Sequence, residues 1–209
     1  MMAEMLKRYP ELAACAEDVR KGIEMICAAY ERGNKVMTCG NGGSAADAEH
    51  IVGELMKGFL CKRALAEEER AALVGCGEGG EFLAQHLQRA LPAISLVSSV
   101  SLATAFANDV APELTFAQQV YGLGVRGDVL IGISTSGTSK NVVYAVIAAK
   151  ARGVQTIGLT GRSGGLLKGL CDITICVPSG CTPEIQEYHL PVYHCICEEV
   201  EARFFDDRR

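Results

Sequence analysis

Residues 38–55 read TCGNGGSAADAEHIVGEL and join the end of an apolar run to a run with helical spacing. Between the two runs stands a loop, residues 40–44, whose three glycines let backbone N–H groups approach an anion closely. The helix that follows favours negative charge at its N-terminus. The stretch therefore predicts a buried strand, a loop able to hold a phosphate and a helix, although a plain tight turn would explain the loop equally well.

Two common phosphate-binding motifs are excluded at this loop. A P-loop needs Gly-Lys-Ser/Thr, which does not follow, and G-x-G-x-x-G fails because the glycines stand at positions 40, 42 and 43. A second loop, ISTSGTSKN at 133–141, also joins an apolar run to a helical pattern. Its hydroxyl residues around Gly137, which are Ser134, Ser136, Thr138 and Ser139, exceed what helix capping needs, which is a single side chain. Two loops rich in hydrogen-bond donors indicate a phosphorylated small molecule as the ligand.

Short apolar runs alternate with helical patterns along the chain. The predicted strands occupy residues 35–39, 93–97, 128–134, 154–160 and 172–178, and the predicted helices occupy 11–32, 44–58, 112–124, 139–153 and 183–205. This alternation is typical of a parallel sheet that is covered on both faces. We predict an α/β fold with a doubly wound, five-stranded parallel sheet. Both loops then lie at the carboxyl ends of strands, where such sheets bind ligands.

The chain, residues 1–209, is predicted to form a single domain. Residues 1–34 are expected to be an N-terminal helical segment. Residues 58–92 are expected to be an excursion within the domain, made of two short helices joined by GCGEGG.

Composition narrows the class of protein. Hydrophobic residues make up 49% of the 209 residues, which excludes disordered and fibrous proteins. No apolar run is long enough to span a membrane and the N-terminus lacks the apolar stretch of a signal peptide, so we expect a cytoplasmic protein. The net charge of -5 argues against nucleic acid as a partner. Ten cysteines without a C-x-x-C pair are expected to be buried thiols.

Four side chains have the chemistry of an active site. His50 and Glu54 are four residues apart and share one face of a helix. Gln186 and His194 lie about 80° apart around the axis of the last helix, which lets them converge on one site. His189 competes with His194, because it stands three residues after Gln186. A solvated helix face and a core histidine remain the alternative interpretation of any one pair.

An ordered set of motifs resembles a known family. The motifs are CGNGGSAADAEH (39–50), AND (107–109), GISTSGTSKNV (132–142), LTGRSGG (159–165) and IQEYHLPVYH (185–194). They are similar to those of the SIS (sugar isomerase) domain, which has a flavodoxin-like fold. They most resemble its phosphoheptose isomerase branch, which converts sedoheptulose 7-phosphate to D-glycero-D-manno-heptose 7-phosphate. The resemblance covers most of the chain apart from residues 58–92.

The resemblance implies a role for each matching residue. Substrate contacts are expected at Asn41, Gly42, Gly43, Ser44, Asn108, Asp109, Ser134, Thr135, Ser136, Ser139 and Gln186. A divalent metal, most often zinc in this family, is expected on His50, Glu54, Gln186 and His194. The acid/base pair is expected to be Glu54 and His194. The family also implies a sugar phosphate substrate, no nucleic acid or membrane partner, and a homotetramer whose active sites are completed by neighbouring subunits.

The expected chemistry explains why a phosphate loop and titratable side chains share one short segment. Aldose–ketose isomerisation moves a proton between two adjacent carbons, commonly through an enediol. A carboxylate can take and return the carbon-bound proton while a histidine serves the oxygens. A metal at the same place would polarise the carbonyl group.

The sequence departs from the family pattern just after Glu54. The usual Gly-Arg-aromatic segment is replaced by Lys57, Gly58 and Phe59, so an arginine that could grip a phosphate with two hydrogen bonds is missing. We expect Arg63 or Lys62 to substitute for it. The segment 61–92 is also longer than in typical members. Both departures leave the identity of the sugar more open than the type of reaction.

Two other functions stay open at this point. A non-catalytic SIS protein, such as the relatives that bind the bacterial replication initiator, would keep the scaffold without needing a base, an acid or metal ligands. A sugar-phosphate sensor usually carries a DNA-binding helical module, and none is visible in the sequence. The presence of all four candidate metal ligands favours the phosphosugar isomerase.

Overall fold

A five-stranded parallel sheet forms the centre of the computed structural model, which describes residues 1–205. The strands follow the order β2-β1-β3-β4-β5, which is the doubly wound order of flavodoxin-like folds. The predicted fold class and the five predicted strands are therefore confirmed. Their bounds are β1 (Val36–Cys39), β2 (Ala93–Ser95), β3 (Val129–Ile133), β4 (Gln155–Thr160) and β5 (Ile173–Cys176).

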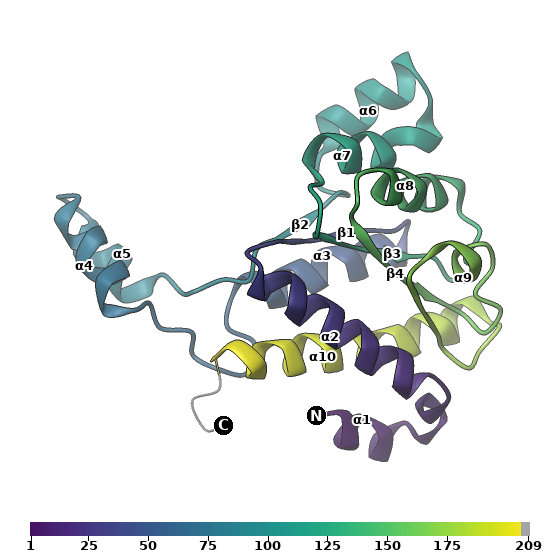
Figure 1. Ribbon diagram of the computed structural model, residues 1–209, viewed down its shortest axis with the longest axis horizontal. Helices are drawn as coiled ribbons and strands as arrows, with labels where there is room; N and C mark the ends of the chain where they lie inside the picture. The colour runs from purple at the N-terminus through teal and green to yellow at the C-terminus, as the bar shows by residue number, and fades with distance from the viewer. Residues whose placement is uncertain (206–209) are drawn as a thin grey trace.

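Helices cover both faces of the sheet (Figure 1). Successive side chains of a strand point to opposite faces. On β3, accordingly, Val129 and Ile131 join one hydrophobic cluster while Leu130 joins the other. The first cluster includes residues of α2 (Ala16–Glu31), α3 (Gly43–Met56) and α10 (Thr182–Phe205). The second includes residues of α7 (Thr115–Leu123), α8 (Lys140–Ala151) and α9 (Leu167–Leu170).

The N-terminal segment is helical but less continuous than predicted. Helix α1 (Met2–Arg8) packs on α10, and a 3₁₀ helix η1 (Pro10–Cys15) precedes α2. The predicted helix 11–32 is therefore wrong over its first turns. Pro10 stands at the first position of η1, where its missing N–H is not needed. Pro191, by contrast, lies inside α10 without ending it.

Two helices were not predicted, α6 (Val100–Asp109) and the single turn α9. Helix α6 carries no buried residue, and its apolar side chains include Val100 and Leu102, which are exposed. A 3₁₀ turn, η2 (Pro112–Leu114), then leads into α7. Helix α6 packs against η2 and α7 and lies at one extremity of the molecule, far from α10 in Figure 1.

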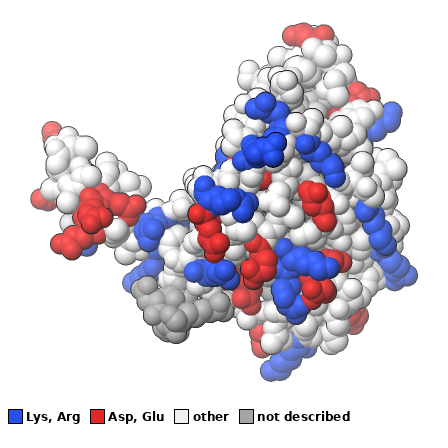
Figure 2. Space-filling model, viewed as in Figure 1, with Lys and Arg blue, Asp and Glu red and all other residues white. Residues whose placement is uncertain are grey.

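Helices α4 (Glu67–Gly75) and α5 (Gly80–His86) form an arm that stands away from the sheet (Figure 1). The two helices pack on each other, and a bridge between Ala64 and Gln88 closes the base of the arm. Figure 2 shows acidic side chains gathered on the arm, where Glu67, Glu68 and Glu69 open α4. The division of the chain into one domain with an excursion stays a prediction.

The loops that follow β1 and β3 meet at the same edge of the sheet. Strands β1 and β3 pair directly although about ninety residues separate them, because β2 lies on the outer side of β1. This is the topological switch point, outside which open α/β sheets bind ligands. No helix within residues 1–205 is long and apolar enough to cross a membrane.

Candidate active site

Two loops at the switch point, residues 40–44 and 133–141, are called the phosphate loops here. The amides of Asn41 and Asn141 join them through two reciprocal hydrogen bonds of 2.9 and 2.8 Å. Asn41 is exposed and Asn141 is only partly buried, so the approach of the two loops brings these partners together. Asn141 was not singled out from the sequence, because nothing local to residue 141 indicates a partner 100 positions away.

The second phosphate loop presents a group of hydroxyls at the start of α8. Ser134 is buried and lies 2.9 Å from the hydroxyl of Ser139, the residue that precedes α8. Ser136 is exposed, and its oxygen accepts hydrogen bonds from the backbone N–H and hydroxyl of Thr138. Gly137 has a φ of +67° and lies against Gly164, where any side chain would collide. The loop is thus held in a shape that exposes donors next to a helix N-terminus, which favours an anion.

A pocket of about 480 Å³ opens beside this loop. Its lining includes Thr135, Ser136 and the side chain of Arg162, whose guanidinium also donates to the carbonyl of Pro178 at 2.7 Å. Arg162 belongs to the LTGRSGG motif, but its role was not predicted. The signal available in the sequence was its position directly after a strand. Arg162 brings a positive charge close to these hydroxyl groups. Gly58, which stands where the family usually has an arginine, cannot provide such a charge.

The first phosphate loop is packed against α10. Gly42 has a φ of +56°, in the left-handed region that favours glycine. A Cβ atom on Gly43 would collide with the side-chain amide of Gln186. Ser44 is 4% exposed at the start of α3. The structure therefore places Gln186 beside the first phosphate loop. His50 lies seven residues after Gly43, which is about 10 Å further along α3.

Near the other end of α3, His50, Glu54, Lys57, Tyr193 and His194 form what we call the reactive cluster. Nε2 of His50 lies 3.1 Å from Oε1 of Glu54, and Nζ of Lys57 donates to Oε2 of Glu54 at 2.7 Å. The Glu54 side chain is 10% exposed, whereas that of Lys57 is 58% exposed. Glu54 is therefore a carboxylate held by two donors at the edge of the core. Lys57 and Tyr193 were not predicted to belong to a site.

His194 completes the reactive cluster from α10. Its ring packs edge-on against that of His50, with the ring centroids 5.1 Å apart. Burial, and after it the nearby His50, lowers the pKa of His194, so that its neutral form is favoured. Its Nε2 atom is buried and has no hydrogen-bond partner among residues 1–205. A buried nitrogen without a partner is free to exchange a proton with a bound molecule.

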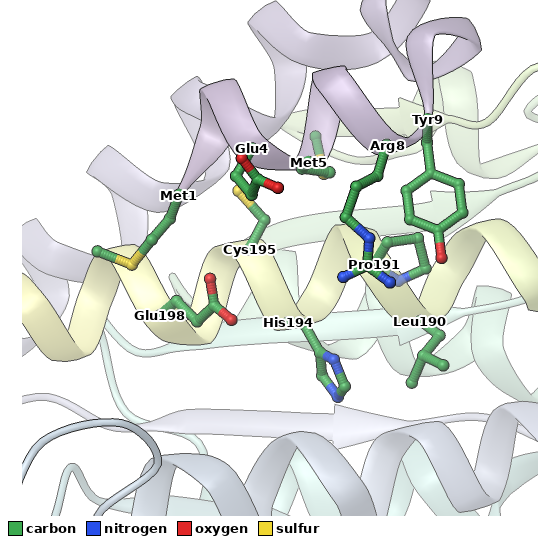
Figure 3. A pocket seen from close by; sticks show the side chains of 10 residues that line it. All are labelled: Met1, Glu4, Met5, Arg8, Tyr9, Leu190, Pro191, His194, Cys195 and Glu198. Carbon is green, nitrogen blue, oxygen red and sulfur yellow. The ribbon is translucent and has the colours of Figure 1, made fainter.

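A pocket of about 290 Å³ lies beside His194, between α1 and α10. Figure 3 shows Arg8 and Glu4 reaching into it from α1, and the ring of His194 pointing away from α1. Leu190, His194 and Glu198 recur every fourth residue and so share one face of α10. Open space is therefore available next to the reactive cluster.

His189 takes no part in this cluster. It is fully buried, and burial lowers its pKa to about 4. The interpretation of His189 as a core histidine is therefore the one that the structure supports. His194, one and a half turns further along α10, faces α3 instead.

Asn108 and Asp109 are not brought to the other candidate residues. They are exposed at the end of α6, and the amide of Asn108 donates to the carboxylate of Asp109 at 2.8 Å. Helix α6 packs against η2 and α7, whereas the reactive cluster lies between α3 and α10. Within one chain these two residues therefore form a separate polar pair.

Arg63 does not substitute for the missing phosphate-binding arginine, so that expectation is wrong. Its side chain is buried, pairs with the buried Glu201 at 2.8 Å and donates to the carbonyl of Glu54 at 2.9 Å. The carboxylate of Glu201 also accepts from the backbone N–H groups of residues 59–61. The pair therefore ties the chain after α3 to α10 and cannot reach a ligand. Lys62 is exposed and stays unassigned.

The expected metal ligands are only partly assembled. Imidazole and carboxylate groups suit zinc, and the unpartnered Nε2 of His194 is an atom that a metal could engage. Within residues 1–205, however, no three His, Cys, Asp or Glu side chains are arranged to hold an ion. Nε2 of His50 faces Glu54, and Gln186 lies beside Gly43. The four residues therefore do not form a ligand set in this arrangement.

Comparison with known proteins agrees with this geometry. The SIS domain family model matches residues 2–76 and 60–161. A phosphoheptose isomerase of Nitratiruptor sp. is 43% identical over 205 residues, covering 96% of this chain and 96% of the relative. One of Synechocystis sp. is 40% identical over 183 residues, covering 88% of this chain and 81% of the relative.

Solved structures give the same result. Phosphoheptose isomerase from Neisseria gonorrhoeae superposes with a TM-score of 0.75 at 33% identity, covering 96% of this chain and 94% of the other. The enzyme from Francisella tularensis gives 0.76 at 32% identity, covering 95% and 93%. The chain therefore belongs to the SIS domain family, in its phosphoheptose isomerase branch, and is a phosphosugar isomerase.

Proposed function

We propose that the chain interconverts sedoheptulose 7-phosphate and D-glycero-D-manno-heptose 7-phosphate by acid/base proton transfer through an enediol. One observation supports the chemistry most strongly. The buried Nε2 of His194 has no partner among residues 1–205, and His194 stands near the Glu54 carboxylate, which is held by two donors. A base and a neutral imidazole side by side are what proton transfer between adjacent carbons and their oxygens requires.

In this proposal Glu54 takes the proton from one carbon and returns it to the next. His50 and Lys57 fix the two carboxylate oxygens, so the base is already oriented before substrate arrives. His194 accepts a proton from one substrate hydroxyl and returns it to the neighbouring oxygen. The lowered pKa of His194 supports this role, because an imidazole must be neutral to accept a proton.

The phosphate group is proposed to bind at the phosphate loops. Ser134, Ser136 and Ser139 supply hydroxyls at the N-terminus of α8, and the first loop supplies the backbone of Gly42 and Gly43. The side chain of Arg162 adds a positive charge at the rim of the pocket. Thr135, Ser44 and the Gln186 amide lie close to these groups and are proposed to contact the sugar chain.

A divalent metal, zinc by its donor types, is a separate proposal. Its expected ligands are His50, Glu54, Gln186 and His194, and binding would require these side chains to move from their present positions. Measuring the metal content of the purified protein tests this directly. About one ion per chain, lost on His194→Ala, supports the site, and no binding at micromolar zinc contradicts it.

We further propose a homotetramer in the cytoplasm with sites shared between subunits. The exposed pair Asn108 and Asp109, far from the reactive cluster of its own chain, motivates this sharing. Mixing inactive Glu54→Gln protein with Asp109→Ala protein provides a test. Recovery of activity on mixing supports shared sites, whereas activity no higher than that of the separate variants contradicts them.

The function itself is tested with a panel of ketose phosphates of five to seven carbons. Aldose phosphate products are followed by chromatography, with and without a chelator. The seven-carbon substrate is expected to be turned over fastest. Turnover of another sugar corrects the substrate, and no turnover on the whole panel contradicts the proposed reaction.

A further inference from the structure

The arm formed by α4 and α5 exposes apolar side chains that its two helices do not bury. Phe82 is 65% exposed, and Val74 and Leu83 are exposed as well. Among the residues described, α4 buries none and α5 buries only Gly80 and Ala84. Helices of nine and seven residues are marginal on their own in water, because most helical stability comes from the packing of an apolar face. A surface that covers the arm would therefore stabilise it.

A groove between the two helices of the arm is called the arm groove here. Two adjoining cavities of about 580 Å³ each form it, and Val74 and Glu81 line both of them. Glu67 lines the first cavity and Glu78 the second, whereas Arg70 is the one basic side chain in the described lining. The groove is thus partly apolar and negatively charged. It fits a partner that offers apolar side chains together with positive charge.

A second arm does not have this character. Residues 67–86 hold five glutamates, one arginine and no lysine. Pairing of two arms would therefore set like charges against each other, which opposes association. Figure 2 shows acidic side chains gathered on the arm and basic side chains spread over the body of the molecule. The complementary surface is therefore to be found on the body.

The carboxyl end of α7 and the loop after it offer such a surface, which we call the arginine face. Tyr121 is 60% exposed, and Leu123 and Val125 are exposed beside it in the chain. The guanidinium of Arg152 lies over the ring of Tyr121, 5.3 Å from its centroid. Arg126, directly after Val125, is also exposed. Apolar side chains accompanied by two arginines complement the arm groove in both hydrophobicity and charge.

We propose that the arm groove of one copy of the chain receives the arginine face of a second copy. The arm and α7 stand apart within one chain (Figure 1), so the contact joins two molecules. Because each copy offers both surfaces, two identical contacts can close around a two-fold axis. The inference rests on the proposed homo-oligomer and names one surface through which its subunits meet. It also gives a role to the excursion at 58–92, which the family motifs do not cover.

Charge reversal on each side of the contact provides the first test. Glu81→Arg and Arg126→Glu each set like charges against each other, so each should raise the dissociation constant between copies about tenfold or more. The combined variant restores opposite charges and should return to within about threefold of the unaltered protein, measured by analytical ultracentrifugation. Glu68→Arg, on the arm but outside the groove lining, and Lys21→Glu, on α2, are the matched controls. Each control should change the dissociation constant by less than about threefold.

A photocross-link identifies the partner surface directly. The photoreactive amino acid p-benzoylphenylalanine takes the place of Phe82, which lines the arm groove and is exposed. Irradiation should give a product of twice the chain mass on a denaturing gel. Mass spectrometry of its peptides should place the link at residues 121–126 of the second copy.

Three results overturn the inference. They are a link to the arm of the second copy or to another element, no product of doubled mass, and a combined charge variant that associates no better than the two single variants. A monomeric unaltered protein contradicts the proposed homo-oligomer and this contact together. An oligomer whose dissociation constant is unchanged by both charge reversals contradicts this contact alone.

Discussion

The two ends of the candidate site are built in different ways. Each phosphate loop is a continuous stretch of the chain, and the hydroxyls of the second loop are joined by hydrogen bonds between residues two to five positions apart. The reactive cluster is assembled from α3 and α10, and the hydrogen bond from Tyr193 to His50 spans 143 positions. The first end depends on local sequence and the second on the packing of two helices.

The difference has a consequence for function. Exposed hydroxyls in the phosphate loops exchange water for ligand, so losing one should weaken binding and leave the rate of the chemical step alone. Partly buried groups in the reactive cluster are oriented before the substrate arrives, so losing one should lower the rate and leave binding alone. Glu54→Gln and Ser136→Ala test this separation directly.

The largest effect is expected for Glu54→Gln, which removes the base and keeps the size of the side chain. Loss of a positioned general base typically lowers the rate about 10²–10⁴-fold. Substrate affinity, measured by calorimetry, should stay within about threefold, because the phosphate loops are untouched. Glu49→Gln, on an exposed position of the same helix, serves as the control. Equal kcat values for Glu54→Gln and the control would show that the base is another residue.

Next in size is the effect of Arg63→Ala on stability. The variant leaves the buried Glu201 without its partner and frees the carbonyl of Glu54. Breaking a buried ion pair costs about 3–5 kcal/mol in free energy of unfolding, measured by urea denaturation. Lys62→Ala, at the exposed neighbouring position, should change it by less than about 0.5 kcal/mol. Similar losses in free energy of unfolding for the two variants would show that the Arg63–Glu201 pair does not tie the chain after α3 to α10.

His189 predicts a dependence of stability on pH. Its pKa is lowered to about 4 in the folded chain, below the unfolded value of about 6.5. The unfolded state therefore binds more protons between these values, and stability falls as the pH drops from about 6.5 to 4. The loss attributable to His189 is up to about 3 kcal/mol. The free energy of unfolding, measured across this pH range, should fall less for His189→Gln than for the unaltered protein. An identical dependence on pH in the two proteins would show that His189 is not the group responsible.

Ser136→Ala is expected to act on binding alone. Losing a hydrogen bond to a charged phosphate costs about 1–3 kcal/mol of binding free energy, measured by calorimetry. The free energy of unfolding should change little, because Ser136 is exposed and its bonds to Thr138 lie within the loop. The kcat value at saturating substrate should remain close to that of the unaltered enzyme. A lower kcat with unchanged affinity would show that this phosphate loop acts on the rate and not on binding.

The smallest effect is expected where the two phosphate loops meet. Asn41→Ala and Asn141→Ala each remove the same reciprocal pair of hydrogen bonds. Each variant should lose about 0.5–1.5 kcal/mol in free energy of unfolding. In a double-mutant cycle the combined variant should lose less than the sum of the two single variants. Strict additivity would show that the contact does not hold the loops together.

Part of the fold was predictable because burial leaves a pattern in the sequence. A strand that is buried on both faces is a short apolar run, and the five runs gave the five strands. Helix α6, none of whose residues is buried, was not predicted. The two short helices of the arm follow from their sequence. Nothing in that segment, however, indicates that they stand clear of the sheet.

Part of the site was predictable too. The hydroxyls of the second phosphate loop and the pairing of His50 with Glu54 follow from residues close together in the chain. Arg63 shows the limit of this reasoning, because a charged residue next to a site is expected to face the ligand. Its burial depends on Glu201, which lies 138 positions away.

The sequence by itself determined the alternation of strands and helices, the carboxyl edge on which the loops lie, and the face that His50 shares with Glu54. These properties arise from backbone periodicity, which extends over a few residues. Only the tertiary structure decided that Tyr193 meets His50, that Asn141 meets Asn41 and that Arg63 is buried. The physical reason is that a helix or a loop fixes the direction of its own side chains. The partner that it meets is fixed by the packing of the whole chain.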